Sequence, residues 1–230
     1  MKINTENPVS SPAGAFVCED IDEILAEEPK IKELAAGFED PVAVSTVIKS
    51  ASLELLFADL SSKLQLLRLY VGASCKQVAE MMDVDEESVY EMEWGDRADA
   101  YMVRHFLSAL RTLSGDDGGR KISAVDVLGP AHDQDIEDCT PTDESIEISD
   151  LCEGADIRDV GTVVEAFELR KDAGRLGRNL KMVREKAGLS PAEVAVRMGD
   201  DMQRVLLWEA GDVLAVPYDV RRYLLATQSV

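Results

Sequence analysis

The chain has 230 residues, and its 45 Asp and Glu against 24 Lys and Arg give a formal net charge of -21 at pH 7. This length is sufficient for two small domains with hydrophobic cores. Its four cysteines form no C-x-x-C pair and it has only two histidines, so we expect free thiols, no disulfide framework and no metal site.

No motif of an active site, a signal peptide or a membrane span stands out. No uninterrupted apolar run approaches 18 residues, and the N-terminus lacks a charged-then-apolar pattern. A Gly-rich phosphate loop, H-E-x-x-H and G-x-S-x-G are all absent from the sequence. We therefore expect a cytoplasmic protein that is not an enzyme, binds no cofactor and does not enter a membrane.

The N-terminal region has two parts. Residues 1–17 are rich in Pro, Ser and Gly, which is typical of a disordered leader. Residues 20–37 carry apolar side chains at helical spacing, interrupted at Pro29. This helix would either pack on the domain that follows it or dock as an arm on a second subunit.

A first helical unit follows. Leucines and Phe57 recur at intervals of three and four over residues 53–67, which places them on one face of a helix. Gly72 stands where a helix needs a left-handed residue after its end. Ser74 then begins a short helix with a capping box completed by Gln77. A further short helix ends at Gly95.

An acidic segment separates this unit from the next. Residues 114–165 hold 15 Asp or Glu against 3 Lys or Arg, and Gly, Pro and Ser are frequent up to residue 156. We interpret 114–156 as an acidic linker. A coil of about 50 residues spans roughly 40 Å root-mean-square, so the units on either side would act independently, or the linker would fold back on the basic face of the second. Residues 157–169 extend the helix that enters the second unit.

The second unit repeats the first. Residues 170–186 form a helix with seven basic and two acidic residues, followed by Gly188, a capping box from Ser190 to Glu193, and a short helix ending at Gly211. The two segments align without a gap at a spacing of 116 residues, which indicates a duplicated structural unit. The identical pairs are Gly72/Gly188, Ser74/Ser190, Val78/Val194, Ala79/Ala195, Met82/Met198, Val89/Val205, Glu93/Glu209 and Gly95/Gly211.

The pattern Gly-x-Ser-x-x-x-hydrophobic-Ala-x-x-hydrophobic, followed by a hydrophobic pair, Glu and Gly, resembles the lambda-repressor-like (Xre-type) helix-turn-helix family. The resemblance covers roughly residues 53–112 and 169–226. It implies an all-α domain of about five helices whose third helix enters the DNA major groove. We therefore expect an all-α chain with two such domains joined by an acidic linker. The predicted segments are a leader at 1–17, an N-terminal domain at 18–113, the linker at 114–156 and a C-terminal domain at 157–230.

The first unit departs from the family where DNA would be contacted. Its third helix opens with Asp85, Glu86 and Glu87, and Glu91 follows one turn later. Four carboxylates would repel phosphates and suit few base edges. The glutamine that the family often has at the start of the preceding helix is Cys75 here. We expect this unit to contact protein rather than DNA.

The second unit is mixed at the same positions. Gln203 and Arg204 open its third helix, and Arg197 lies on the preceding helix, so these side chains are candidates for base or phosphate contacts. Further along, Leu206 and Leu207 occupy positions that are usually polar in the family. Two outward leucines favour an apolar contact with protein.

The basic helix that precedes this unit offers further candidates. Arg175, Arg178 and Lys181 would contact phosphates if the helix faced DNA. The alternative is a solvated basic face without a ligand. The sequence leaves both interpretations open.

Two functions follow. The first is a transcription regulator that binds DNA through its C-terminal unit, while the acidic N-terminal unit dimerises or contacts protein; a single module binds weakly, which favours a homodimer. The second is an interaction protein of DNA-mimic, antitoxin-like or phage type that binds a basic protein partner. Salt adaptation would also make a chain acidic, but it should acidify both units alike. Family resemblance favours the first function, which we take as the leading one, whereas the contact positions favour the second.

Overall fold

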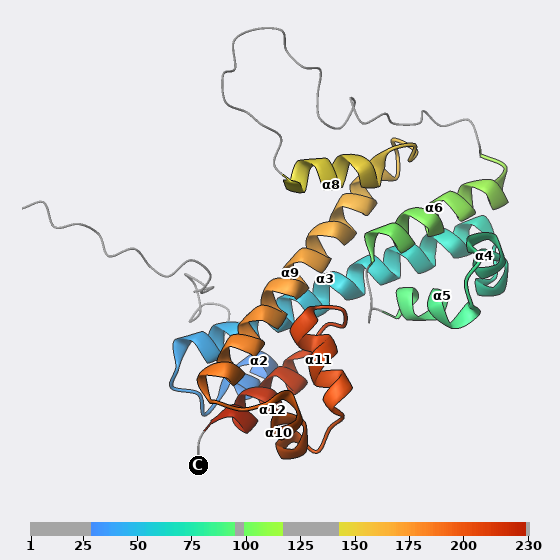
Figure 1. Cartoon of the computed structure of the whole chain (residues 1–230). Helices are drawn as coiled ribbons and strands as arrows, with labels where there is room; N and C mark the ends of the chain where they lie inside the picture. Colours follow the sequence, from blue (N-terminus) through green and yellow to red (C-terminus); the bar gives the residue numbers. More distant parts are fainter. Residues whose placement is uncertain (1–28, 95–98, 117–142, 229–230) are drawn as a thin grey trace, which may run out of the picture.

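The computed structural model describes residues 29–94, 99–116 and 143–228, and all regular structure within these ranges is helical (Figure 1). The all-α fold class is therefore confirmed. The leader predicted at 1–17 lies outside the described residues. The helices of the first half are α2 (Pro29–Ala35), α3 (Pro41–Val71), α4 (Cys75–Met82), α5 (Glu86–Glu93) and α6 (Ala100–Ser114). Those of the second half are α8 (Asp143–Cys152), α9 (Val160–Lys186), α10 (Pro191–Met198), α11 (Met202–Ala210) and α12 (Pro217–Thr227).

The two halves share their local geometry. Helices α4 and α10 begin and end 116 residues apart. Gly72 and Gly188 both adopt the left-handed conformation predicted for them, with φ of 75° and 70°. The two capping boxes are also present, because Ser74 and Ser190 each accept from the backbone N–H three residues on, and the side chain at that position accepts from their own N–H.

The long helices α3 and α9 cross at the centre of the molecule (Figure 1). They run antiparallel, since Lys49 on α3 binds Asp172 on α9 while Lys63, further along α3, binds the earlier Glu165. Helix α12 packs on α3 and α6 packs on α9. Each half of the chain thus places its last helix against the long helix of the other half.

The short helices α2 and α8 also contact both halves of the chain. Helix α2 packs on α3 and on α12, and α8 packs on α9 and on α6. Arg221 on α12 donates to the carbonyl oxygens of Leu34 and Ala36 at 2.5 and 2.7 Å, and Arg104 on α6 donates to that of Glu153 at 2.5 Å. The helix predicted in residues 20–37 therefore packs, over its described part, on α3 of the domain that follows it, which was the first of the two alternatives, and it also contacts α12 of the other half.

Two expectations need correction. The C-terminal part of the predicted linker at 114–156 is not a linker, because α8 lies in it and buries Leu151 and Cys152 against the fold. The halves also do not act independently, because α3 and α9 pack on one another. The helix predicted over residues 157–169 is confirmed from Val160, where α9 begins.

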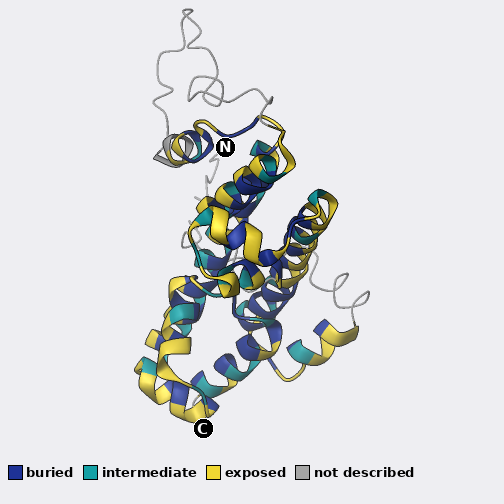
Figure 2. Cartoon of the chain, turned by 90° about the vertical axis from the view of Figure 1, so that its right-hand side faces the viewer, coloured by how far each residue is buried: buried dark blue, intermediate teal, exposed yellow. Residues whose placement is uncertain are grey.

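The hydrophobic core follows the inner faces of the long helices. Leu53, Leu60 and Leu64 of α3 are buried, as are Leu176 and Leu180 of α9. Figure 2 shows buried residues along these inner faces and exposed residues on the outer faces. Helix α3 is also long and apolar enough to cross a membrane by composition, with a mean hydropathy of 1.4 over 18 residues, but half of that window is buried in the fold. The buried apolar residues of α3 are those that a helix at the centre of this fold requires.

Candidate interaction surfaces on α5 and α11

A buried ion pair holds α5 in the first half and α11 in the second. Arg68 on α3 binds Glu93 at the end of α5 with distances of 2.5 and 2.6 Å, and Arg184 on α9 binds Glu209 on α11 at 2.7 and 2.7 Å. Both pairs are bidentate, and each arginine also donates to the carbonyl oxygen of the residue after the glycine that follows its helix. The neighbouring carboxylate raises the pKa of both arginines.

This pair was not predicted from the sequence, where Arg184 was one of the seven basic residues of 170–186. A signal for it was available, because Arg and Glu stand 25 residues apart in both units. In the second half the pair is extended by Tyr223, whose hydroxyl lies 2.6 Å from Glu209 Oε1. Burial and that carboxylate raise the pKa of Tyr223. The orientation of α11 is therefore set by a charged cluster in the core.

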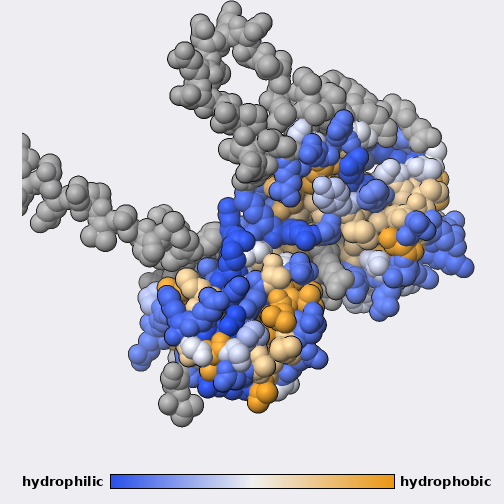
Figure 3. All heavy atoms as spheres, viewed as in Figure 1, coloured by the Kyte–Doolittle hydropathy of each residue, from blue (hydrophilic) through white to orange (hydrophobic). Residues whose placement is uncertain are grey.

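The outer face of α10 and α11 carries three exposed large apolar side chains among charged ones. Val196 on α10 is 80% exposed, and Met202 and Leu206 on α11 are also exposed. Figure 3 shows hydrophobic residues gathered over α10 and α11 in the lower part of the view. Gln203 is exposed beside them, whereas Leu207 is only half-buried rather than outward as predicted. We call Val196, Met202, Gln203 and Leu206 the α10–α11 surface.

The two arginines predicted beside this surface already have partners. Arg204 donates to Asp219 on α12 at 3.1 Å, and its guanidinium lies over the Trp208 ring, 5.0 Å from the centroid. Arg197 donates to the carbonyl oxygen of Ala226 at 2.9 Å. Both side chains are directed toward α12, so a contact with DNA would have to replace these interactions.

The predicted basic face of α9 is smaller than its sequence indicates. One of its arginines is buried in the ion pair with Glu209, and Arg170 binds Asp99. Arg175 binds Asp172 at 3.1 Å. Arg178 and Lys181 are exposed, and no ion pair is formed by either within the part of the chain that the structure describes. The predicted phosphate-contacting set is thus reduced to these two cations.

The equivalent surface on α4 and α5 is acidic. Asp85 is the N-cap of α5 and accepts from Ser88 N at 2.7 Å, and hydrogen bonds from Ser88 lower the pKa of Asp85. Glu86 and Glu87 are exposed in the first turn, where the helix dipole favours carboxylates. The fourth predicted carboxylate, Glu91, lines a cavity instead. Asp85 is exposed at the start of α5, whereas Glu91 is only half-exposed and faces the cavity.

Comparison at the 116-residue spacing shows how unlike the two faces are. Val196, Met202, Gln203 and Leu206 on α10 and α11 correspond to Glu80, Glu86, Glu87 and Tyr90 on α4 and α5. These four residues of the first half are all exposed, and we call them the α4–α5 surface. Two of the four matched positions, Val196/Glu80 and Met202/Glu86, are therefore apolar in one half and acidic in the other.

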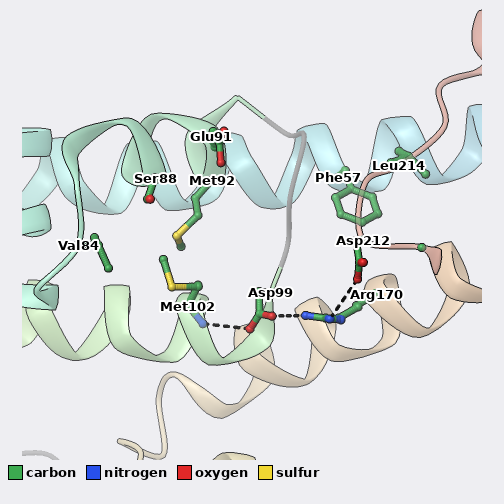
Figure 4. Close-up of a pocket in the computed structure, with 11 residues that line it drawn as sticks. Phe57, Val84, Ser88, Glu91, Met92, Asp99, Met102, Arg170, Asp212 and Leu214 are labelled. Carbon is green, nitrogen blue, oxygen red and sulfur yellow. Dashed lines mark hydrogen bonds and ion pairs between the residues drawn. The ribbon is translucent and has the colours of Figure 1, made fainter. Parts of the chain in front are cut away.

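The cavity between the halves has a volume of about 480 Å³ and is lined by residues of α3, α5, α6 and α9 and of the segment after α11. Figure 4 shows Arg170 there between Asp99 and Asp212. Asp99 also caps α6 by accepting from the N–H of Tyr101 at 2.8 Å. Arg170, Asp99 and Asp212 at the cavity are thus engaged with one another. Among residues 29–94, 99–116 and 143–228, no group of three His, Cys, Asp or Glu is placed to hold a metal ion.

No family model, no curated protein and no solved structure matches this chain. The resemblance to the lambda-repressor-like family therefore remains a prediction from the sequence motifs. The candidate function depends on the side chains at the two surfaces.

Proposed function

We propose that the chain is an interaction protein built on two lambda-repressor-like helix-turn-helix domains, and that it binds protein rather than DNA. The repeated turn, the two capping boxes and the repeated buried ion pair support the two domains. The observation that carries the function is the apolar α10–α11 surface, at the place where this family presents polar residues to DNA. This proposal reverses the order of the two functions considered from the sequence.

Physical chemistry favours a protein partner at this surface. Val196, Met202 and Leu206 are solvated in the isolated chain, and each apolar side chain buried against a partner contributes about 1–2 kcal/mol. Base edges and phosphates offer these side chains little beyond a thymine methyl group. The centres of protein interfaces, in contrast, are apolar and poor in charge.

The α4–α5 surface is acidic and therefore suits a basic partner. Glu80, Glu86 and Glu87 are exposed together on a chain that carries a net charge of -21. Such a face attracts basic protein surfaces, including those that otherwise contact DNA, and the attraction weakens as salt rises. The two surfaces would then engage different partners, or two unlike patches of one partner.

Site-specific photo-crosslinking tests the proposal. A photoreactive amino acid at Leu206, introduced into the chain in its source cells, should give a protein adduct that mass spectrometry can identify. The same group at Ile157, which is also exposed but lies before α9, is the matched control. The adduct should disappear when Val196→Glu is added. Adducts of equal yield at both positions would contradict the proposal.

DNA binding is the second candidate, because Gln203, Arg178 and Lys181 are exposed. Binding of the full chain to mixed genomic DNA fragments across a salt series tests it. We expect no binding. Binding that falls with salt and loses about two units of log–log slope in the Arg178→Ala, Lys181→Ala variant would establish DNA contact, since each phosphate contact contributes about 0.9 to the slope.

A further inference from the structure

The outer face of α3 carries apolar residues that no part of the described chain covers. Leu55, Leu66, Leu69 and Tyr70 are exposed, with Leu66 at 65% and Tyr70 at 91%. Leu55 and Leu66 are 11 residues apart, which is three helical turns, so they lie on the same side of the helix. This side is opposite the buried residues of α3. A contiguous exposed patch of this kind marks a contact surface.

The fold itself does not require these apolar residues. At the 116-residue spacing, Leu55, Leu66, Leu69 and Tyr70 correspond to Lys171, Met182, Glu185 and Lys186 on α9. The two long helices have equivalent places in the two halves, yet only α3 has an apolar outer face. The difference points to a contact made by α3 and not by α9.

The same face contains one acid and one base. Asp59 and Lys63 are both exposed and, with Leu66, Leu69 and Tyr70, they line a shallow groove along α3. They are four residues apart, which is about 6 Å along a helix. A charge pair of this kind can match its own copy when that copy runs in the opposite direction.

We propose that this face binds a second copy of the chain, with the two α3 helices packed antiparallel across a two-fold axis at the level of residue 61. Asp59 of each copy then lies at the level of Lys63 of the other, and Leu56 lies at the level of Leu66. Lys63 also binds Glu165 within its own chain at 3.0 Å, and its ammonium group has three donors to share between the two carboxylates.

The available area is consistent with a dimer. Leu55, Leu66, Leu69 and Tyr70 are the exposed apolar residues of this face, and Leu56 and Leu67 are two more at its edge, beside the buried Leu60 and Leu64. If each of these six residues buries on the order of 100 Å², together they provide roughly 600 Å² per copy. Asp59, Ser62 and Lys63 add further area, and the total approaches the ~800 Å² per partner of a stable interface. The packing repeats an arrangement already present in the chain, where α3 and α9 run antiparallel with Lys–Asp and Lys–Glu pairs at their sides.

Sedimentation equilibrium of the full chain tests the proposal. The chain has a mass of 25.2 kDa, and we expect the dimer at micromolar concentration. Leu66→Glu should raise the dissociation constant at least tenfold, whereas Val196→Glu on the exposed α10–α11 surface should leave it unchanged. A monomer at all concentrations up to about 100 μM, or an equal effect of the two substitutions, would overturn the proposal and leave the face to a different protein.

Oxidative cross-linking tests the direction and level of the packing. In a chain with Cys18 and Cys139 replaced by serine, Ser62→Cys places one thiol per copy a residue away from the proposed axis. The two α-carbons are then offset by about 3 Å along the helices, and we expect a rapid interchain disulfide. Ser108→Cys, exposed on α6, is the matched control and should not cross-link. Equal rates for the two variants would exclude this arrangement. Neither experiment depends on the function proposed above.

Discussion

Neutralising Glu209 should destabilise the fold more than any exposed charge change. Glu209 and its partner Arg184 are both buried, and Glu209→Gln keeps the shape of the side chain while leaving the guanidinium without its counter-charge. Removing one partner of a buried pair costs about 3–5 kcal/mol. The Tyr223 hydroxyl, 2.6 Å from Glu209 Oε1, loses a charged acceptor in the same variant. For a chain of this size, each kcal/mol lowers the melting temperature by about 2–4 °C.

Urea unfolding followed by circular dichroism measures this loss as a change in the midpoint at a constant slope. Glu185→Gln is the control, because Glu185 is exposed and lies 3.9 Å from the same arginine. That variant should change stability by less than about 0.5 kcal/mol. A loss below about 1 kcal/mol in Glu209→Gln, or similar losses in both variants, would refute the assignment of the buried pair as the contact that holds α11.

Two further predictions concern close packing and pH. Gly177→Ala should destabilise the fold by more than about 2 kcal/mol, because a Cβ at Gly177 would lie 2.3 Å from the Trp208 carbonyl oxygen. Gly161→Ala, where nothing lies within 4 Å of the added Cβ, should stabilise the fold slightly. Thermal melts of the two variants measure the difference. Asp156 accepts hydrogen bonds from Arg158, which lowers the pKa of that carboxyl well below its usual range. Its stabilising contribution is therefore present above about pH 4 and is lost as the pH falls toward the folded-state pKa. Acid titration of Asp156→Asn should lose part of this dependence, and an unchanged acid transition would contradict the assignment.

The repeated turn could be predicted because its signals are local. Ser74 and Gln77 are three residues apart, as are Ser190 and Glu193, and both capping boxes form as predicted. Gly72 and the glycine at the matched position need only their own backbone conformation. Helix type and the helix ends therefore follow from short stretches of sequence.

Helix α8 was missed because its stabilising contacts are distant. It lies in an acidic segment whose composition is typical of a linker, and Leu151 and Cys152 are buried only because α6 and α9 pack beside them. The arginines of the second unit were misjudged for the same reason. Arg184 has its carboxylate partner, Glu209, 25 residues later. Arg204 on α11 has its partner, Asp219, on the next helix, α12.

The sequence by itself determined an all-α chain with a duplicated helical unit, and it placed the glycines and caps that bound the short helices. Only the tertiary structure decided which charges face solvent, because burial and ion pairing join residues that are far apart along the chain. It also decided that the last helix of each half packs on the long helix of the other half, α12 on α3 and α6 on α9. That packing leaves α10–α11, α4–α5 and the outer side of α3 as three surfaces of different chemistry.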